Sequence, residues 1–178
     1  MVYVAADPLL EDEVLVRYNL TFRSITEADQ PFLKQVYAST REEELAIVPW
    51  PEEQKQTFLE FQFNAQHTFY QNQFGDAAFW VIEQAGVPIG RLYLDRRADE
   101  IRIIDIALLP AYRDRGIGTA LLNTILAVGQ ANNQPVRIHV EQNNRALNLY
   151  RRLGFVQIGG ESVYYLMEWT PSDNNIIN

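Results

Sequence analysis

The sequence predicts an α/β protein, with one mixed sheet covered by helices on both faces. Apolar, β-branched runs typical of strands alternate with stretches whose apolar residues recur every three to four positions, as in amphipathic helices. The expected order is a strand, two or three helices, three strands, a helix, a strand, a helix and two strands. Because this order matches neither regular strand–helix repetition nor a sandwich of two sheets, it favours a mixed sheet.

The first third of the chain is predicted to hold one strand and then helices. Residues 14–23 alternate polar and apolar side chains, as a strand does. Thr26, with an acid three positions later, is typical of a helix start, and helices are expected over 27–39 and 41–48. The next helix, 51–71, begins with a proline suited to a first turn and two acids suited to the positive end of the dipole.

An aromatic stripe marks this last helix. Four residues share helical spacing and two more widen the stripe; they are Phe58, Phe61, Ala65 and Phe69, with Phe63 and Tyr70. A stripe of this kind is typical of a helix face packed in the core. The alternatives are a wall of an acceptor pocket or a dimer face.

The remaining elements alternate strands with helices. Strands are expected over 77–84, 87–96, 101–109 and 135–141, helices over 116–132 and 144–153, and a closing hairpin over 155–158 and 162–169. Gly154 suits the left-handed residue that ends the second of these helices. Residues 14–169 are expected to form a single domain, with flexible ends at 1–13 and 170–178.

Composition limits the kind of protein. Apolar residues make up 47% and charged residues 21% of the 178 residues, which are ordinary values for a globular domain. There is no cysteine, which excludes disulfides, thiolate nucleophiles and cysteine-bound metals and favours a cytoplasmic location. No basic segment followed by a long apolar run opens the sequence, and no apolar run could span a bilayer. Neither a signal peptide nor a membrane partner is therefore expected.

Charge is distributed unevenly along the chain. The net charge of −8 argues against nucleic acid as a partner. Residues 1–60 hold 12 acids against 5 basic residues, whereas residues 110–152 hold six arginines against two acids. A polyanionic cofactor near the basic segment and a cationic substrate near the acidic one would fit this distribution. For any single charge, a solvated surface position is the commoner explanation.

Residues 101–120 carry the clearest functional signal. Their apolar strand ends at Pro110, and Arg113-x-x-Gly116-x-Gly118 then opens a helix rich in apolar residues. A helix start offers free N–H groups and a favourable dipole to an anion, and glycines let phosphate approach the backbone. The stretch indicates a site for a phosphate-bearing cofactor, with simple packing of strand, turn and helix as the alternative.

A second motif lies one helix and one strand further on. Its pattern is Asn143-x-x-Ala146-x-x-Leu149-Tyr150-x-x-x-Gly154-Phe155. In this order and spacing, the two motifs together resemble those of the GNAT superfamily of acyl-CoA-dependent N-acetyltransferases. The stretches WPEEQKQTFLEFQFNAQHTFYQNQF and VYYLMEW are similar to a bacterial subgroup of that superfamily. The resemblance extends to fold, cofactor and reaction type, but not to the acceptor.

The resemblance implies both a fold and a cofactor. The fold is the GNAT acyl-CoA N-acyltransferase fold, in which a central, mostly antiparallel sheet splays between its fourth and fifth strands. The co-substrate is acetyl-CoA, with no metal. The first motif then corresponds to the pyrophosphate loop, and the preceding strand to the segment that bonds the pantetheine arm. The residues implied in cofactor binding are Ile106, Ala107, Leu108, Arg113, Asp114, Arg115, Gly116, Ile117, Gly118, Thr119, Asn143, Ala146 and Tyr150.

Some of these roles have a simpler alternative. The side chain of Arg113 or Arg115 is expected to reach phosphate, or else to be an ordinary surface arginine. Asn143 is expected to hydrogen-bond the cofactor arm, to cap the following helix, or both. A backbone N–H near Ala107 or Leu108 is expected to polarise the thioester carbonyl.

The resemblance also implies that the acetyl group passes directly to the acceptor, without an acyl-enzyme intermediate, and it indicates which side chains act as acid and base. Tyr150 is placed as the general acid for the CoA thiolate, or else as a packed helix tyrosine. Asp105 is the first candidate for the general base, or else a strand-end carboxylate paired with Arg102 or Arg137. Further candidates for the base are Glu42, Glu43, Glu44 and Glu141. Two isolated histidines, His67 and His139, lack the ligand count and spacing of a metal site.

The predicted function is transfer of the acetyl group of acetyl-CoA to a primary amine. The acidic first third of the chain favours a cationic small molecule or peptide amine. The alternatives are transfer of another acyl group, a hydroxyl acceptor, and a non-catalytic module that binds or senses acyl-CoA. A homodimer through the aromatic helix is a further open alternative.

Overall fold

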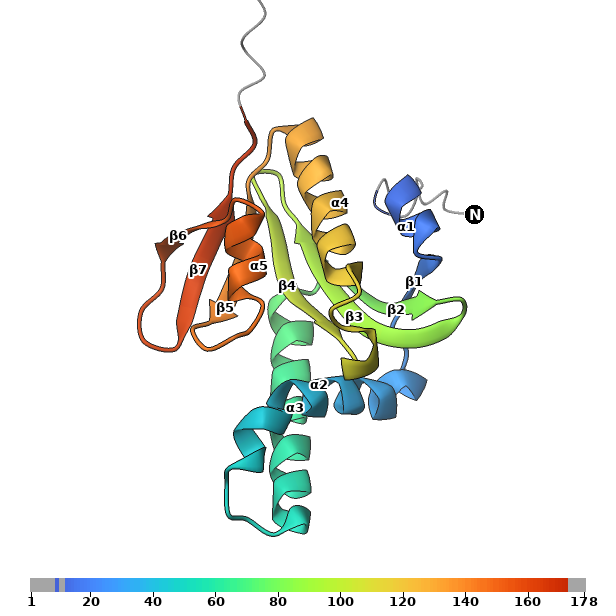
Figure 1. The fold of residues 1–178 in the computed structure, drawn as a ribbon, viewed down its shortest axis with the longest axis vertical. Coiled ribbons are helices and arrows are strands. Elements are labelled where there is room, and N and C mark those ends of the chain that lie inside the picture. The colour runs from blue at the N-terminus through green and yellow to red at the C-terminus, as the bar shows by residue number, and fades with distance from the viewer. Residues whose placement is uncertain (1–8, 10–11, 173–178) are drawn as a thin grey trace, which may run out of the picture.

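The computed structural model describes Leu9 and residues 12–172, which contain one seven-stranded sheet in the order β1-β2-β3-β4-β5-β7-β6 (Figure 1). The strands are β1 Leu20–Ser24, β2 Ala78–Gln84, β3 Val87–Arg96, β4 Ile101–Leu108, β5 Val136–Glu141, β6 Val156–Gly159 and β7 Tyr164–Trp169. Neighbouring strands are antiparallel except β4 and β5, which run parallel. The predicted mixed, mostly antiparallel sheet is confirmed.

Helices cover both faces of the sheet. Figure 1 shows α4 in front of the sheet, α3 behind it and α2 across its lower end. The helices are α1 Glu13–Arg17, α2 Gln30–Ala46, α3 Glu52–Gln73, α4 Ile117–Asn132 and α5 Leu147–Arg152, with 3-10 turns η2 Glu27–Asp29 and η3 Pro110–Tyr112. The ends of α2 and α3 that meet at their connecting loop project below the sheet as a hairpin.

The main core lies between α4 and the sheet. Leu92 and Leu94 of β3 are buried there together with residues of α4 such as Leu121. Side chains alternate between the two faces of a strand, so Arg91 and Tyr93 of β3 lie on the opposite face, which α3 covers. This alternation puts a buried arginine beneath α3.

Residues 14–23 do not form one strand, and that prediction was wrong. Their first half is α1, and only their second half is β1. The Asp12 carboxylate accepts a hydrogen bond from the Val14 N–H (2.7 Å) and caps the helix, and Leu15 is buried. Asn19, with a φ of 54°, then turns the chain into the strand. Local capping therefore outweighed an alternation that a short helix also accommodates.

The two short helices predicted before residue 48 are one helix, α2, which η2 precedes. The predicted helix start is present, because the Thr26 N–H donates to the Asp29 carboxylate (2.7 Å). At the expected break, the hydroxyls of Ser39 and Thr40 donate to carbonyls three residues earlier. The helix accommodates these polar residues through such bonds and does not end at them.

The aromatic stripe of α3 is mostly exposed, so its assignment to the core was wrong. Phe58, Phe61 and Phe69 are 38%, 68% and 58% exposed. Of the two residues that widen the stripe, Phe63 is buried against α2, and the Tyr70 ring meets the Tyr93 ring of β3 at 6.1 Å between centroids. The stripe's alternative uses, as a pocket wall or a dimer face, stay predictions.

The predicted flexible ends, 1–13 and 170–178, lie largely outside the described residues. Of the part that the structure describes, Leu9 is buried in the main core, and the Ser172 N–H donates to Gln130 Oε1 of α4 (3.0 Å). Over the described ranges, no helix is long and apolar enough to cross a membrane. The same ranges hold no group of three or more side chains suited to a metal ion.

Candidate functional site

Strands β4 and β5 pair at one end and separate at the other. Parallel pairing joins only Ile101–Ile103 to Val136–Ile138, and β4 continues beyond it without β5 alongside. At the paired end, the buried carboxylate of Glu100 forms ion pairs with Arg102 (3.0 Å) and Arg137 (2.7 Å), which hold the two strands together. The predicted splay between the fourth and fifth strands is confirmed. We call the separated part the β4–β5 opening.

The free edge of β4 presents backbone groups to this opening. The Leu109 N–H donates to the Ile89 carbonyl of β3 (2.8 Å). Because successive N–H groups point to opposite edges of a strand, those of Ile106 and Leu108 point away from β3 and toward the opening. By the same alternation, the N–H of Ala107 points toward β3. Of the two amides expected to polarise a carbonyl, only that of Leu108 faces the opening.

The loop after β4 leads into the first turn of α4. Gly116 has a φ of 82° and no side chain caps the helix there, while a Cβ at Gly116 would meet the Tyr18 hydroxyl at 2.7 Å. The first α-helical bond runs from the Ala120 N–H to the Gly116 carbonyl (2.9 Å), so the N–H groups of residues 117–119 have no acceptor within the helix. A Cβ built on Gly118 meets no atom within 4 Å, which leaves space beside these groups.

This geometry fits the predicted cofactor. Free N–H groups, the positive end of a 16-residue helix and open space at Gly118 are the features that a pyrophosphate requires. The free edge of β4 suits an arm that carries amide groups, because such an arm pairs with a strand edge through the backbone. The two features adjoin each other along the chain, at the end of β4 and the start of α4.

The Arg113 side chain forms hydrogen bonds within the protein. Its Nε donates to the Leu108 carbonyl (2.8 Å), and its Nη2 donates to the Ser39 hydroxyl of α2 (2.9 Å). Burial, followed by the nearby positive charge of Arg145, lowers the pKa of Arg113. In this arrangement Arg113 ties the loop to β4 and to α2, and its guanidinium does not extend freely toward a phosphate.

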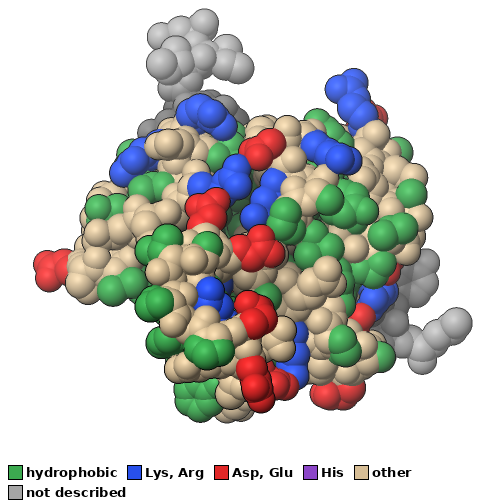
Figure 2. Space-filling view, turned by 60° about the horizontal axis from the view of Figure 1, so that its bottom comes forward, with side chains coloured by type: hydrophobic (Ala, Val, Ile, Leu, Met, Phe, Trp, Pro, Cys, Tyr) green, Lys and Arg blue, Asp and Glu red, His purple; other side chains and the backbone are tan. Residues whose placement is uncertain are grey.

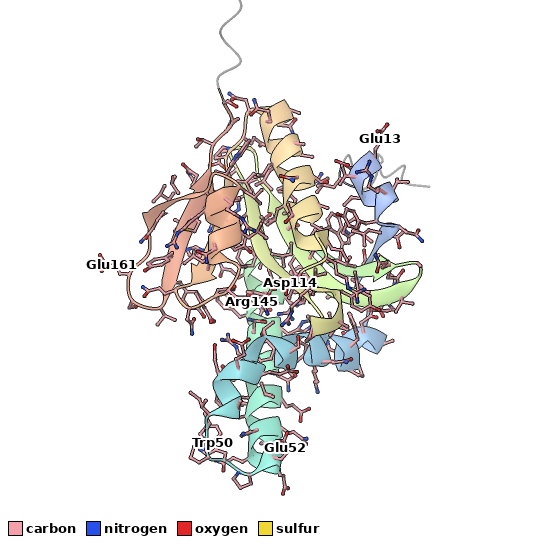
Figure 3. The ribbon with its side chains drawn as sticks, in the orientation of Figure 1. Glu13, Trp50, Glu52, Asp114, Arg145 and Glu161 are labelled. Atoms are coloured by element: carbon pink, nitrogen blue, oxygen red, sulfur yellow. The ribbon has the colours of Figure 1, made fainter. Side chains whose placement is uncertain are left out.

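Two other arginines near the loop are more accessible. The exposed Arg115 guanidinium lies over the Tyr112 ring, 5.7 Å from its centroid. Arg145, after β5, forms an ion pair with Asp114 at 3.0 Å, and Figure 3 shows these two residues meeting. Both side chains of this pair are more than half exposed, and such pairs are weak in water. The two loops that carry the sequence motifs therefore approach each other with exposed cations.

The second motif places its residues near α5. Asn143 is exposed, and it does not cap the helix as expected; the neighbouring Asn144 accepts a hydrogen bond from the Ala146 N–H (2.8 Å). Of its two expected roles, Asn143 thus keeps only the hydrogen bond to the cofactor arm. Tyr150 of α5 is 3% exposed, and its ring packs edge-on against Phe155 at 5.6 Å.

The Tyr150 hydroxyl keeps its proton at neutral pH. Burial raises the pKa of Tyr150, and the negative charge of Asp105 raises it further. A protonated phenol suits a general acid, which must hold a proton until a leaving group needs it.

Asp105 does not pair with Arg102 or Arg137, as its simpler alternative supposed. Those two arginines bind Glu100 at the paired end of the strands. Asp105 Oδ2 instead accepts hydrogen bonds from Nη2 of Arg91 (2.8 Å) and, more weakly, from the Tyr70 hydroxyl (3.4 Å). The Asp105 side chain remains 15% exposed.

The sequence interpretation did not identify Arg91, and it did not identify Tyr70 as a partner of Asp105. Arg91 is 2% exposed, and its Nη2 also donates to Gln66 Oε1 of α3 (2.9 Å). Burial lowers the pKa of Arg91, but the Asp105 charge and nearby tyrosines outweigh burial and leave the pKa raised. For Tyr93 of the same strand, burial raises the pKa to about 12. A single arginine within the apolar run IGRLYL was the signal that could have identified this cluster.

The other candidate bases differ in whether an arginine binds them. Glu141 is held by Arg41 of α2 through two hydrogen bonds (2.7 and 2.9 Å), and Glu44 also contacts Arg41 at 3.2 Å. Glu42 and Glu43 are exposed and form no ion pair with any residue from 12 to 172. Figure 2 shows a face of the molecule on which acidic side chains run down the middle with Lys and Arg side chains beside them.

Comparison with known proteins gives consistent matches. The profile of the acetyltransferase (GNAT) family matches residues 34–155. An N-alpha-acetyltransferase of Sulfurisphaera tokodaii is 30% identical over 105 residues, which span 51% of this chain and 63% of that relative. The chain therefore matches less than two thirds of the relative's length.

Solved structures share the fold. The PaiA N-acetyltransferase from Thermoplasma acidophilum, in complex with coenzyme A, superimposes with a TM-score of 0.62 at 18% identity and covers 85% of this chain and 98% of its own. The ribosomal-protein-S18-alanine N-acetyltransferase from Escherichia coli superimposes with a TM-score of 0.58 at 20% identity, covering 89% and 99%. At these identities the likeness establishes the fold.

Proposed function

The chain belongs to the acetyltransferase (GNAT) family, and on this basis we propose that it transfers the acetyl group of acetyl-CoA to a primary amine. The observation that carries the proposal is the β4–β5 opening beside the uncapped first turn of α4. One part offers a strand edge and the other offers an anion site, and acetyl-CoA has an amide-bearing arm joined to a pyrophosphate. The coenzyme A complex of the similar T. acidophilum protein supports this choice of co-substrate.

Each part of the co-substrate has a place in this arrangement. The N–H groups of residues 117–119 bind the pyrophosphate at the positive end of α4, and the exposed Arg115 and Arg145 add positive charge nearby. The backbone edge at Ile106 and Leu108 binds the pantetheine arm. When bound, acetyl-CoA supplies an acetyl group activated as a thioester.

The chain's own groups then assist the transfer to the amine. The Leu108 N–H faces the opening, where it can stabilise negative charge on a carbonyl oxygen. Tyr150 keeps a proton on its hydroxyl, ready for the departing sulfur. Asp105 faces the same site with a partly exposed carboxylate, which can accept a hydrogen bond from the amine. No side chain needs to carry the acetyl group.

Acidic side chains on α2 support a cationic amine. Glu141 and Asp105 are each balanced by an arginine, whereas Glu42 and Glu43 of α2 have no such partner within the described ranges. These two acids favour an acceptor with positive charge beyond the reacting nitrogen. The S. tokodaii relative is named for acetylation of α-amino groups, which supports an amine acceptor and includes peptides among the candidates.

A thiol-release assay tests the proposal. Acetyl-CoA is supplied with a panel of diamines, basic peptides with free α-amino groups, neutral amines, acidic amines and alcohols. We expect release with primary amines, fastest with cationic ones, and less release when longer acyl-CoAs replace acetyl-CoA. Calorimetric binding of CoA with no thiol release across the whole panel would refute the transferase proposal and indicate a binding module. Faster turnover of neutral or acidic amines would refute the cationic acceptor.

A further inference from the structure

Arg91 is a buried cation whose surroundings do not satisfy it completely. It lies in the middle of β3 with 2% of its surface exposed, and its only carboxylate partner among the described residues is Asp105. Its Nε, like the nearby Tyr93 hydroxyl, is buried and meets no hydrogen-bond partner within the described ranges. Burying a guanidinium is unfavourable unless its donors are paired. A residue kept for stability alone would be better paired, so this one calls for a functional explanation.

The two oxygens of Asp105 differ in their contacts. Oδ2 accepts from both Arg91 and Tyr70. Oδ1 accepts no hydrogen bond from the residues at 9 and 12–172, and the side chain is 15% exposed. Asp105 also lies past Ile103, the last residue of β4 that pairs with β5, and therefore at the β4–β5 opening. One oxygen is thus held by the protein, and the other remains for a ligand.

We propose that Arg91 is a positioning residue for the acceptor. With Tyr70, it fixes Oδ2 of Asp105, so that Oδ1 is presented at the β4–β5 opening to hydrogen-bond the amino group of the acceptor. This inference rests on the proposed function, because it concerns the acceptor of the same site. Arg91 acts through Asp105 and does not itself touch the substrate.

The charge balance gives this arrangement a specific consequence. The positive charge of Arg91 compensates the negative charge of Asp105, so the pair attracts the acceptor less through net charge than through a directed hydrogen bond. Orientation of the reacting nitrogen then depends on the Arg91–Asp105 contact, while attraction of a cationic acceptor depends on groups elsewhere. Loss of Arg91 should therefore weaken acceptor binding but leave the binding of acetyl-CoA unchanged.

A double-mutant cycle tests whether Arg91 acts through Asp105. The variants are Arg91→Gln, Asp105→Asn, the two combined, and Arg91→Lys. Arg23→Gln is the matched control, because Arg23 of β1 also binds carboxylates through hydrogen bonds, those of Asp29 and Glu83, but away from the opening. The measurements are kcat and the separate KM values for acetyl-CoA and for the best amine of the panel, beginning with 1,4-diaminobutane.

The expected result is specific to the amine. Arg91→Gln and Asp105→Asn should each raise the KM of the amine about tenfold, as loss of one oriented hydrogen bond does, and the double variant should raise it no further. Arg91→Lys should restore part of the loss. Additive losses in the double variant, equal rises in both KM values, or an effect no different from that of Arg23→Gln would each overturn the inference.

A crystal structure of Arg91→Gln gives a readout that needs no turnover. We expect the Asp105 carboxylate to leave its original orientation while the backbone of β4 stays in place. A carboxylate that does not move would overturn the inference, whatever the activity. Absence of thiol release by the unmodified protein would refute the proposed function, but it would not change this structural outcome, so the two failures are distinguishable.

Discussion

Replacement of Gly118 by tryptophan should abolish tight CoA binding without unfolding the protein. The substitution puts an indole into the open space at the first turn of α4. A Cβ at this position meets no other part of the protein within 4 Å, and the backbone is not in the left-handed region, so a side chain can start here without strain. Tryptophan also has a higher helix propensity than glycine, by a few tenths of a kcal/mol, so helix stability should not fall.

The size of the effect follows from the N–H groups that the indole would cover. Residues 117–119 offer three N–H groups without acceptors in the helix, and hydrogen bonds to charged groups contribute about 1.5–3 kcal/mol each. If the pyrophosphate loses two of these bonds, the loss is about 3 kcal/mol or more, which corresponds to a fall in CoA affinity of at least about 100-fold.

Calorimetric titration with CoA measures this loss, and thermal unfolding checks the fold. Gly75→Trp is the matched control, because Gly75 lies in the turn between α3 and β2 and a Cβ there also meets nothing within 4 Å. The control should bind CoA like the unmodified protein. CoA affinity unchanged in Gly118→Trp, or reduced equally in both variants, would falsify the assignment of the loop.

Three further predictions concern the acid, the sheet and the pH dependence of stability. Tyr150→Phe should lower kcat about 100-fold with CoA affinity unchanged by calorimetry, and an unaltered kcat would reduce Tyr150 to packing. Gly90→Ala should cost about 1–3 kcal/mol in thermal unfolding, because its Cβ would lie 2.3 Å from the Ala107 carbonyl oxygen; an unchanged Tm would contradict this contact. The Arg23 guanidinium holds the pKa of Asp29 well below its usual range, so this stabilisation is complete above about pH 4 and is lost as pH falls further. The free energy of unfolding, measured with urea, should therefore fall less on acidification for Asp29→Asn than for the unmodified protein. Equal falls would argue against this role of the Arg23–Asp29 pair.

Strands bounded by strong local signals were predicted closely. The predicted strand 87–96 has the bounds of β3, and 77–84 differs from β2 by one residue. Ala85 and Gly86 between them have φ values of 50° and 78°, which suit a tight two-residue hairpin turn. The alternation of side chains and the turn residues act within a few positions of each other, so a single sequence is enough to reveal them.

The buried face of α3 could not be predicted in the same way. Leu59, Phe63, Gln66 and Tyr70 face the protein. The other aromatic residues of the stripe, Phe58, Phe61 and Phe69, are exposed. Gln66 breaks the apolar pattern because its partner is the buried Arg91 of β3. A polar residue on a buried face is favourable only when another element supplies its hydrogen bond, and that element is distant in the sequence.

In the candidate site too, features set by the local backbone were predicted and contacts between distant segments were not. The motif after β4 located the glycine turn and the free amides of α4, because both depend on the local backbone. It did not reveal that Arg113 binds Leu108 and Ser39, nor that Asp105 meets Arg91 instead of Arg102 or Arg137. Long charged side chains have many partners within reach, and only the folded packing selects among them.

The pattern of residues thus predicted most of the succession of strands and helices along the chain and the glycine turn before α4, since each follows from backbone geometry that neighbouring residues impose. Which face of α3 is buried, which oxygen of Asp105 is held and which amides of β4 are free depended on contacts between distant segments. Those contacts arise when β4 and β5 separate and α3 closes over Arg91. The reason is that burial and hydrogen-bond satisfaction are properties of the assembled fold, which no local window of sequence contains.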